Sequence, residues 1–432
     1  MQIDRQNLRL EGIYPQRQKD RFMQRIKLPA GIISAEQALT VAEVAKRVAR
    51  GMVHLTTRGS IELHWLTEDD LIAVAAQLAR VGLVNRGACG GAVRGVVCGS
   101  LGAAGAPRLE SLVRKIHRYF SGNPRFEKLP KKFKIAVEAD TATGRHLIQD
   151  LGFVAAPDAD GVSRFDVWAA GGLGREPSPG FLLARALPED SLIPLVETVL
   201  RVYEANTPPG KRLKHLVREI GVEEFRRRVL EDPATAELLP TVPSLTGALV
   251  RPPEQPAGRL EAHVFSGELP AASLAALAEV AARFCGGVLM ITGDQNVVLH
   301  VAPGSDPGEA RAALADAGFA GADPRERVVI RVCPGTHECM MGLAPTREVA
   351  RAIADAMSEA GMALSWAISG CPNSCAQPQL SEVGIIASRL VNDPAGRTPR
   401  FDLYRKGDRP FGIPVHQGLT LNELLDEIRR IG

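Results

Sequence analysis

Two stretches of this chain repeat each other without a gap. Residues 42–64 (AEVAKRVARGMVHLTTRGSIELH) and residues 278–300 (AEVAARFCGGVLMITGDQNVVLH) are identical at nine of 23 positions, at an offset of 236 residues. The register also holds downstream, where Gly82 corresponds to Gly318. Solenoid units are much shorter, about 20–50 residues, so this period is not that of a solenoid. The repeat predicts a duplicated domain pair.

Both copies have the same predicted order of helix, strand, strand and helix, from the spacing of their apolar residues. The predicted elements are helices over 36–49 and 270–284, strands over 52–56 and 288–292, strands over 60–65 and 296–301, and helices over 68–81 and 307–317. This order predicts an α+β class, with helices covering an antiparallel sheet.

A longer module follows each copy, and the Pro-rich segment 240–256 looks like the linker between the two halves. We therefore predict four units. They are a first repeat over 1–85, a first module over 86–240, the linker and second repeat over 241–324, and a second module over 325–432.

The composition is that of a globular protein, with 432 residues, 45% of them hydrophobic, and a net charge of only +3. This charge predicts no general attraction to nucleic acid. The chain has no run of 18 apolar residues and no apolar segment near Met1, so we expect neither a membrane span nor a secretory signal. Seven cysteines without such a signal favour a reducing compartment, and we expect the cytoplasm.

Four cysteines near the C-terminus form two pairs. Five residues separate Cys333 from Cys339, and three separate Cys371 from Cys375. Four thiolates are the ligand set of an iron–sulfur cluster. Structural zinc also takes four, but usually with tighter two-residue spacings. Four unrelated buried thiols are the remaining alternative.

Basic residues recur in the first half of the chain. Lys132 and Lys134 are two apart on a predicted strand, so their side chains should share one face. Arg25 and Arg94 lie in the contexts RIKLPAG and AVRGVVC. A single Lys or Arg is usually a solvated surface charge, whereas several converging cations offset the cost of desolvating a small anion.

These cysteine and basic motifs together resemble the sirohaem-dependent sulfite and nitrite reductases, the nitrite and sulphite reductase 4Fe–4S proteins. The resemblance covers nearly the whole chain from Gly12 onward. It implies a pseudo-twofold duplicated α+β architecture with two ferredoxin-like repeats and two sirohaem/4Fe–4S-binding modules. It also implies that all four cysteines bind a 4Fe–4S cluster, and that the Cys375 thiolate ligates the sirohaem iron as well.

The resemblance further implies residues for the substrate and for sirohaem. The substrate anion would contact Arg25, Arg94, Lys132 and Lys134. Nitrite-preferring relatives typically have Asn in place of the second lysine, so Lys134 favours sulfite. The predicted cofactor-binding residues are Thr56, Thr57, Arg58, Gln295, Asn296, Thr336, Asn373 and Cys375.

Three positions depart from the pattern that this family often has. His54 stands where the family often has Arg, Glu62 where it often has Gln, and Gly95 where it often has Asn. The first two changes remove or reverse favourable contacts to carboxylates, so they bear on how sirohaem would be held.

The implied activity is the six-electron reduction of sulfite to sulfide, or of nitrite to ammonia. No Gly-rich dinucleotide fingerprint is evident, so an external donor such as a ferredoxin or a flavoprotein subunit is implied. Two alternatives stay open. One is an enzyme similar to precorrin-3B synthase of the cobalamin pathway, and the other is a non-catalytic iron–sulfur electron-transfer subunit.

Overall fold

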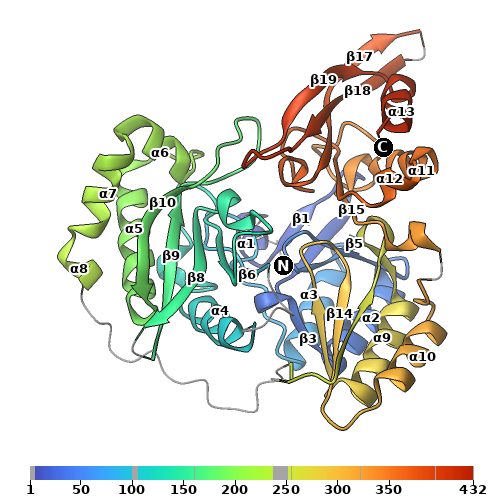
Figure 1. Ribbon diagram of the computed structural model, residues 1–432, viewed down its shortest axis with the longest axis horizontal. Helices are drawn as coiled ribbons and strands as arrows, with labels where there is room; N and C mark the ends of the chain where they lie inside the picture. Colours follow the sequence, from blue (N-terminus) through green and yellow to red (C-terminus); the bar gives the residue numbers. More distant parts are fainter. Residues whose placement is uncertain are drawn as a thin grey trace.

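The protein consists of two repeats and two modules, which a computed structural model arranges as in Figure 1. The structure describes residues 5–99, 106–159, 161–236, 252–253, 255–321, 323–394 and 396–431. The predicted linker over 240–256 lies mostly outside these residues. In Figure 1 the first module (teal to green) and the second module (orange to red) lie on different sides of the paired repeats.

Each repeat contains every helix and strand that the sequence predicts. The first repeat has α1 (Arg5–Leu10), β1 (Ile13–Pro15), β2 (Phe22–Ile26), β3 (Ile32–Ser34), α2 (Ala35–Val48), β4 (Met52–Leu55), β5 (Ile61–Leu66) and α3 (Asp70–Arg80). The second has β11 (Gly258–Ala262), β12 (Glu268–Pro270), α9 (Ala271–Phe284), β13 (Val288–Ile291), β14 (Val297–Val301) and α10 (Pro307–Asp316).

The two repeats exchange one short strand each. Strand β3 pairs with β13 of the second repeat, where Leu289 lies opposite Ile33. Strand β12 pairs in return with β4, where Glu268 lies opposite His54. The resulting sheets have the orders β1-β2-β5-β4-β12 and β11-β14-β13-β3, and all their pairings are antiparallel.

The same backbone conformations recur at the repeat offset of 236 residues. Ala30 and Ser266 have φ values of 58° and 57°, and the glycines that follow them have 75° and 69°. Such left-handed conformations are uncommon for residues other than glycine. Their recurrence before β3 and before β12 shows that both copies direct the exchanged strand in the same way.

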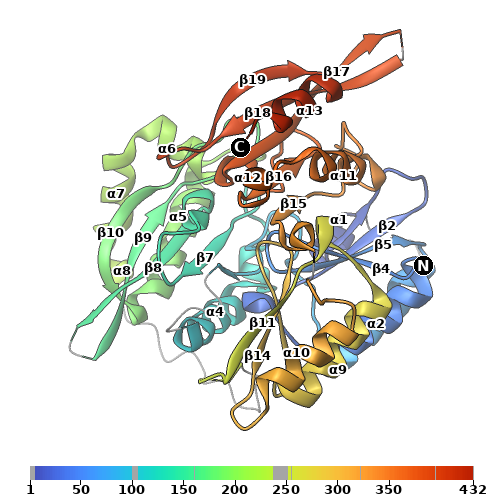
Figure 2. The same cartoon turned by 45° about the vertical axis from the view of Figure 1, so that its right-hand side comes forward.

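Helices α2 and α9 pack against each other and cover the joined sheets (Figure 2). The buried residues Ala38, Val41 and Ala45 lie on one face of α2 at helical spacing, and Leu274, Leu277 and Ala281 occupy the same places in α9. One hydrophobic core contains buried side chains from both repeats. The repeats therefore form one folded body.

Gly31 allows the exchange, because its backbone lies directly against β13. A Cβ at Gly31 would lie 2.1 Å from the carbonyl oxygen of Ile291, and its φ is 75°. We expect Gly31→Ala to lower the free energy of unfolding by about 3 kcal/mol, from left-handed strain and overpacking together. Denaturant-induced unfolding measures this change.

Gly51 provides the matched control for this prediction. It has a φ of 70°, but a Cβ there would meet no atom within 4 Å. Gly51→Ala should therefore cost only the backbone strain, about 1 kcal/mol. Equal losses in the two variants would contradict the role of close packing at Gly31.

The two modules have the same sheet topology. The first has β6 (Val97–Cys98), α4 (Ala106–Phe120), β7 (Ile135–Glu138), β8 (Leu151–Ala159), β9 (Val162–Ala169), β10 (Phe181–Pro188), α5 (Leu192–Asn206), α6 (Leu213–Ile220), α7 (Val222–Leu230) and α8 (Pro233–Ala236). The second has β15 (Ile330–Val332), α11 (Thr346–Ala356), α12 (Glu359–Met362), β16 (Trp366–Ser369), β17 (Val383–Asp393), β18 (Gly396–Arg405), β19 (Ile413–Leu419) and α13 (Leu421–Arg429).

In each module the first three strands are parallel and the last two are antiparallel to their neighbours. The orders are β6-β7-β8-β9-β10 and β15-β16-β17-β18-β19. The whole chain is therefore a duplicated α+β architecture, as expected from the resemblance. The division at residues 85, 240 and 324 stays a proposal, since β3 and β12 are each bonded into the other repeat's sheet.

Candidate active site

The four motif cysteines lie in two neighbouring loops of the second module. Cys333 and Cys339 follow β15, and Cys371 and Cys375 follow β16, which runs parallel beside β15. Parallel neighbours end at the same edge of a sheet, so the two loops meet there. All four thiols are free. We call residues 333–342 and 370–377 the cysteine loops.

Glycines let the two cysteine loops pack backbone against backbone. A Cβ at Gly370 would lie 2.9 Å from the Cα of Gly335, and one at Gly342 would lie 2.3 Å from the carbonyl carbon of Gly335. The amide of Leu343 donates to the carbonyl oxygen of Gly370 at 2.7 Å. The positions of the cysteines are thus fixed by the backbone.

The thiols interact with one another electrostatically. Burial raises the pKa of Cys333, and the neighbouring Cys375 and Cys371 raise it further. Burial likewise raises the pKa of Cys371 to about 11, with Cys375 and Cys339 acting in the same direction. The amide of Gly370 donates to Cys333 Sγ at 3.1 Å. Buried thiolates are unfavourable without a nearby positive charge, which iron supplies in a cluster.

Among the described residues, no group of three or more His, Cys, Asp and Glu side chains is arranged to hold a single metal ion. In a 4Fe–4S cluster the four thiolates bind different iron atoms. The four mutually interacting free thiols, with an amide directed at one sulfur, fit that larger group.

Five basic side chains form a cationic cluster beside Cys375: Arg25, Arg58, Arg94, Lys132 and Lys134. They come from β2, from the β4–β5 turn, and from the segments before β6 and β7. Electrostatic interactions link the two lysines to Cys375 and to each other, Lys134 to Arg58, and Arg58 to both other arginines. The structure therefore brings together all four predicted anion-binding residues.

The two lysines sit just before β7, not on it. The extended segment nevertheless pairs with the chain before β6, through a bridge between Val93 and Phe133. Burial lowers the pKa of Lys132 to about 8, and burial, Arg58 and Lys132 lower that of Lys134 well below its ordinary value. Burial and the charges of Arg94 and Arg25 lower the pKa of Arg58 to about 9. Burial is the main cause of these shifts, and the neighbouring cations add to it, which fits a site for an anionic ligand.

The predicted rim residues lie where the first repeat meets the cysteine loops. Thr57 Oγ1 donates to the carbonyl oxygen of Cys375 at 2.8 Å, and Arg58 Nη2 donates to the carbonyl oxygen of Gly95 at 2.8 Å. Thr56 Oγ1 instead accepts from the amides of Arg58 and Ser60 within its own turn. Thr57 and Arg58 thus lie beside Cys375 and the cationic cluster.

Gln295 and Asn296 have their side-chain amides engaged with other parts of the protein. Gln295 is 1% exposed and donates to the carbonyl oxygens of Leu55 and Val332. Asn296 accepts from the amide of Val264 and donates to Glu261. These contacts do not support the prediction that both donate to sirohaem. Thr336 is half-buried and Asn373 is exposed, each within a cysteine loop.

Sequence reasoning missed several charged residues that support the cationic cluster. Asp150 Oδ2 accepts from Arg212 Nη2 at 2.7 Å and from the amide of Lys134 at 2.9 Å. Lys214 donates to carbonyl oxygens of the glycine-rich loop over 171–176. The available signal was the basic string Lys211-Arg212-Leu213-Lys214, of which Arg212 and Lys214 are buried at the start of α6.

Asp294 of the second repeat forms ion pairs with one arginine from each module, next to the segment that follows Cys375. It accepts from Arg145 Nη2 at 2.6 Å and from Arg331 Nη1 at 2.9 Å. Arg331 also donates to the carbonyl oxygens of Ala376 and Gln377, directly after Cys375. Burial raises the pKa of Asp294, but the two guanidinium groups outweigh it and hold that pKa well below its usual range.

We expect Asp294→Asn to lower the free energy of unfolding by about 2 kcal/mol at neutral pH, because two buried arginines lose their carboxylate. A depressed folded pKa stabilises the protein above the unfolded value, about 3.9, and this stabilisation is lost as the pH falls. The difference from the unsubstituted protein should therefore shrink in acid. Urea unfolding across pH measures it.

Asp232→Asn is the control, since its partner Arg201 is 50% exposed. It should change stability by less than about 1 kcal/mol. A comparable loss from both substitutions would contradict the role of Asp294.

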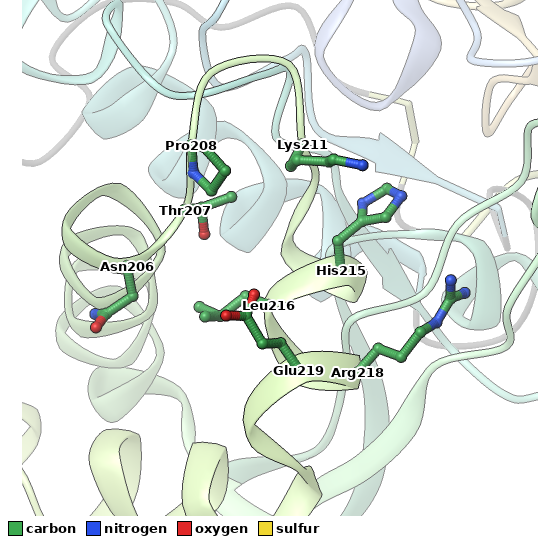
Figure 3. A pocket seen from close by; sticks show the side chains of 8 residues that line it. All are labelled: Asn206, Thr207, Pro208, Lys211, His215, Leu216, Arg218 and Glu219. Carbon is green, nitrogen blue, oxygen red and sulfur yellow. The ribbon is translucent and has the colours of Figure 1, made fainter.

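The cavity in Figure 3 is lined by residues other than those of the cysteine loops and the cationic cluster. Its lining comes from the end of α5, the following loop and α6: Asn206, Thr207, Pro208, Lys211, His215, Leu216, Arg218 and Glu219. None of them is a predicted site residue. The convergence of the cysteine loops and the cationic cluster therefore defines the candidate site.

Two family models match this chain. The nitrite/sulfite reductase ferredoxin-like half domain matches residues 14–81 and 252–317, which are the two repeats. The nitrite and sulphite reductase 4Fe–4S domain matches residues 93–238, which are the first module. The motif cysteines themselves lie outside both matches.

Curated relatives span nearly the whole chain. Sulfite reductase (ferredoxin) 2 of Mycolicibacterium paratuberculosis is 27% identical over 95% of this chain and 78% of its own. Ferredoxin–nitrite reductase of Synechococcus elongatus is 28% identical over 95% of this chain and 85% of its own. The structure of the Mycobacterium tuberculosis NirA protein has the same fold, with a TM-score of 0.81 and 23% sequence identity. The match covers 99% of this chain and 87% of that chain.

The fold and the matches define an oxidoreductase of the sulfite and nitrite reductase class. This chain belongs to the nitrite and sulphite reductase 4Fe–4S family. The family implies a 4Fe–4S cluster and sirohaem as its cofactors, and the cysteine loops and the cationic cluster fit them. No helix among the described residues has the length and apolar character needed to cross a membrane.

Proposed function

We propose that this chain reduces sulfite to sulfide, or nitrite to ammonia at the same site, with six electrons in either case. The observation that carries the proposal is the convergence of the cationic cluster on Cys375, the one exposed thiol of the four. When bound, sirohaem and the cluster supply the electrons and an open iron site.

The proposed cluster ligands are Cys333, Cys339, Cys371 and Cys375, with Cys375 also ligating the sirohaem iron. Its exposure supports this double role, since an exposed sulfur beside the cationic cluster can meet a second group. Thr57 and Arg58 are the proposed rim donors, with Thr336 and Asn373 on the cysteine loops. Gln295 and Asn296 are better explained as buried structural amides.

The cationic cluster would bind the substrate anion and supply protons. The lysine ammonium groups form no hydrogen bond to other described residues, so they are available to oxygen atoms of a ligand. A pKa of about 8 keeps Lys132 largely protonated at neutral pH yet able to give up its proton. Arg94 and Arg25 would hold and orient the anion.

An external donor would supply the electrons. The names of the relatives from Mycolicibacterium paratuberculosis and Synechococcus elongatus specify ferredoxin, so we propose a ferredoxin for this chain. The second substrate candidate, nitrite, is supported by the name of the latter relative.

The test is the visible absorption spectrum of anaerobically purified protein, before and after sulfite is added under reducing conditions. A Soret band and a red-shifted chlorin-type band, both perturbed by sulfite, are expected. An iron–sulfur shoulder alone, in protein from a host able to make sirohaem, would contradict the proposal. It would favour the precorrin-type enzyme or the electron-transfer subunit instead.

A further inference from the structure

Arg25 is already paired with a carboxylate inside the protein. Its Nε and Nη2 both donate to Oε1 of Glu62, with Nε at 3.1 Å. The two residues lie opposite each other on the paired strands β2 and β5. The side chain of Arg25 is 30% exposed and that of Glu62 only 7%. The guanidinium group therefore faces outward with the carboxylate beneath it.

Glu62 is held in its ionised form by its neighbours. Burial raises the pKa of Glu62, but Arg25, His64 and His54 outweigh this effect and hold it well below its usual range. His64 Nε2 lies 3.3 Å from Glu62 Oε2 on the same strand, and His54 lies opposite Glu62 on β4. Glu62 is also within electrostatic range of Cys339. A permanent negative charge thus lies at the edge of the cationic cluster.

This charge changes what Arg25 offers to a ligand. The electric field of an ion pair falls off faster with distance than that of a single charge. The two opposite charges therefore largely cancel for a group that lies some way from the pair. A ligand near Arg25 therefore meets a donor of hydrogen bonds with little net positive charge. Asp150 pairs with Arg212 on the other side of the cluster in the same way. The remaining positive charge resides on Arg58, Arg94, Lys132 and Lys134.

We propose that Glu62 shifts the charge selectivity of the site toward a monoanion, nitrite or hydrogensulfite, by weakening the binding of the sulfite dianion. This inference rests on the proposed function. The four remaining cations attract a dianion about twice as strongly as a monoanion, and Glu62 offsets part of this advantage because it also repels the dianion about twice as strongly. The remaining N–H groups of Arg25 can still donate hydrogen bonds to either ligand.

The first test uses the unsubstituted holoprotein without a catalytic electron donor. Dissociation constants for nitrite and sulfite are measured by titrating the visible spectrum across pH. Sulfite loses its proton near neutral pH, whereas nitrite stays a monoanion throughout. The pH dependence of the ratio of the sulfite to the nitrite dissociation constant therefore shows how the site responds to the second negative charge of sulfite. Because the titration of Lys132 affects the binding of both anions, the ratio of their dissociation constants corrects for it.

The second test replaces Glu62 by glutamine, which keeps the shape and removes the charge. In Glu62→Gln the ratio of the sulfite to the nitrite dissociation constant at alkaline pH should fall by roughly tenfold relative to the unsubstituted protein. The reason is that the second negative charge of sulfite is no longer repelled by a carboxylate across a partly solvated site. The matched control is Glu197→Gln. Glu197 also accepts from an arginine, Arg125, at 2.9 Å, but lies on α5 outside the cluster. It should leave the ratio unchanged.

The outcomes separate this inference from the proposed function. If both anions bind but the ratio at alkaline pH in Glu62→Gln equals that of the unsubstituted protein, the inference is wrong while the function stands. If neither anion perturbs the spectrum, the proposed function and the inference fail together. Should Glu62→Gln not bind sirohaem, Glu62→Met, which also removes the charge at a similar side-chain length, is titrated in its place with the same expected change of the ratio.

Discussion

Cys375→Ser protein should be purified with about four fewer iron atoms per chain, and with its sirohaem bands shifted, or with about five fewer where the sirohaem is lost as well. Cys375 is the proposed shared ligand, so one substitution should disturb both cofactors. Serine offers a hydroxyl that is not ionised at neutral pH, whereas iron binds the thiolate of cysteine. Reductase activity should fall below detection. Iron and sulfide analysis and the visible spectrum measure these effects.

Misfolding would not explain such a result, because the Cys375 side chain is exposed and its backbone contacts do not involve sulfur. The matched control is Cys285→Ser, at a buried cysteine in the second repeat. We expect this control to lose about 1–3 kcal/mol of stability but to keep its full iron content. A Cys375→Ser protein with both cofactors spectrally intact would disprove the shared ligand.

The sequence was sufficient to predict the duplicated fold, because hydrophobic spacing and an ungapped register both survive in the two repeats. The strand exchange was not predictable. Strand β3 has only three residues, Ile32–Ser34, and its apolar pattern suits either sheet. Its choice of β13 depends on the left-handed turn at Ala30 and on the close approach of Gly31 to Ile291, which are tertiary features.

The duplication of the modules was similarly hidden from the sequence. Their loops differ in length, so the two sheets share an order of strands but no ungapped register. Only the resemblance to a family implied this second pair. Topology can therefore persist after the sequence signal is lost, since packing requires the apolar pattern of each strand and not identical residues.

The sequence indicated several residues that the structure brings together at the candidate site, but not how they pair. Arg25 and Glu62 were each noted in the sequence, yet their ion pair depends on the register between β2 and β5. Gln295 was expected to donate to a cofactor, because it lies at the place in the second repeat that corresponds to the rim-binding segment of the first. In the structure its amide is buried between the backbones of Leu55 and Val332, where it joins the first repeat to the second module.

Lys134→Asn should weaken sulfite turnover more than nitrite turnover. We expect kcat/KM to fall about 100-fold for sulfite and about tenfold for nitrite, the range found when one charged or hydrogen-bonding donor is removed from an anion site. Sulfite has three oxygen atoms and nitrite two, so sulfite depends on one donor more. The ammonium of Lys134 lies near Cys375 and forms no hydrogen bond to another described residue.

The substitution should leave the fold intact, because Asp150 holds Lys134 through its backbone amide, which asparagine retains. Lys131→Asn removes the same charge from an exposed neighbour and is the matched control. It should change both rates less than about twofold, since exposed charges are screened by solvent and salt. Steady-state kinetics with both anions and a common electron donor measure the ratio. Equal losses for sulfite and nitrite in Lys134→Asn would remove the basis for preferring sulfite, and would leave the charge of Glu62 as the feature that selects between them.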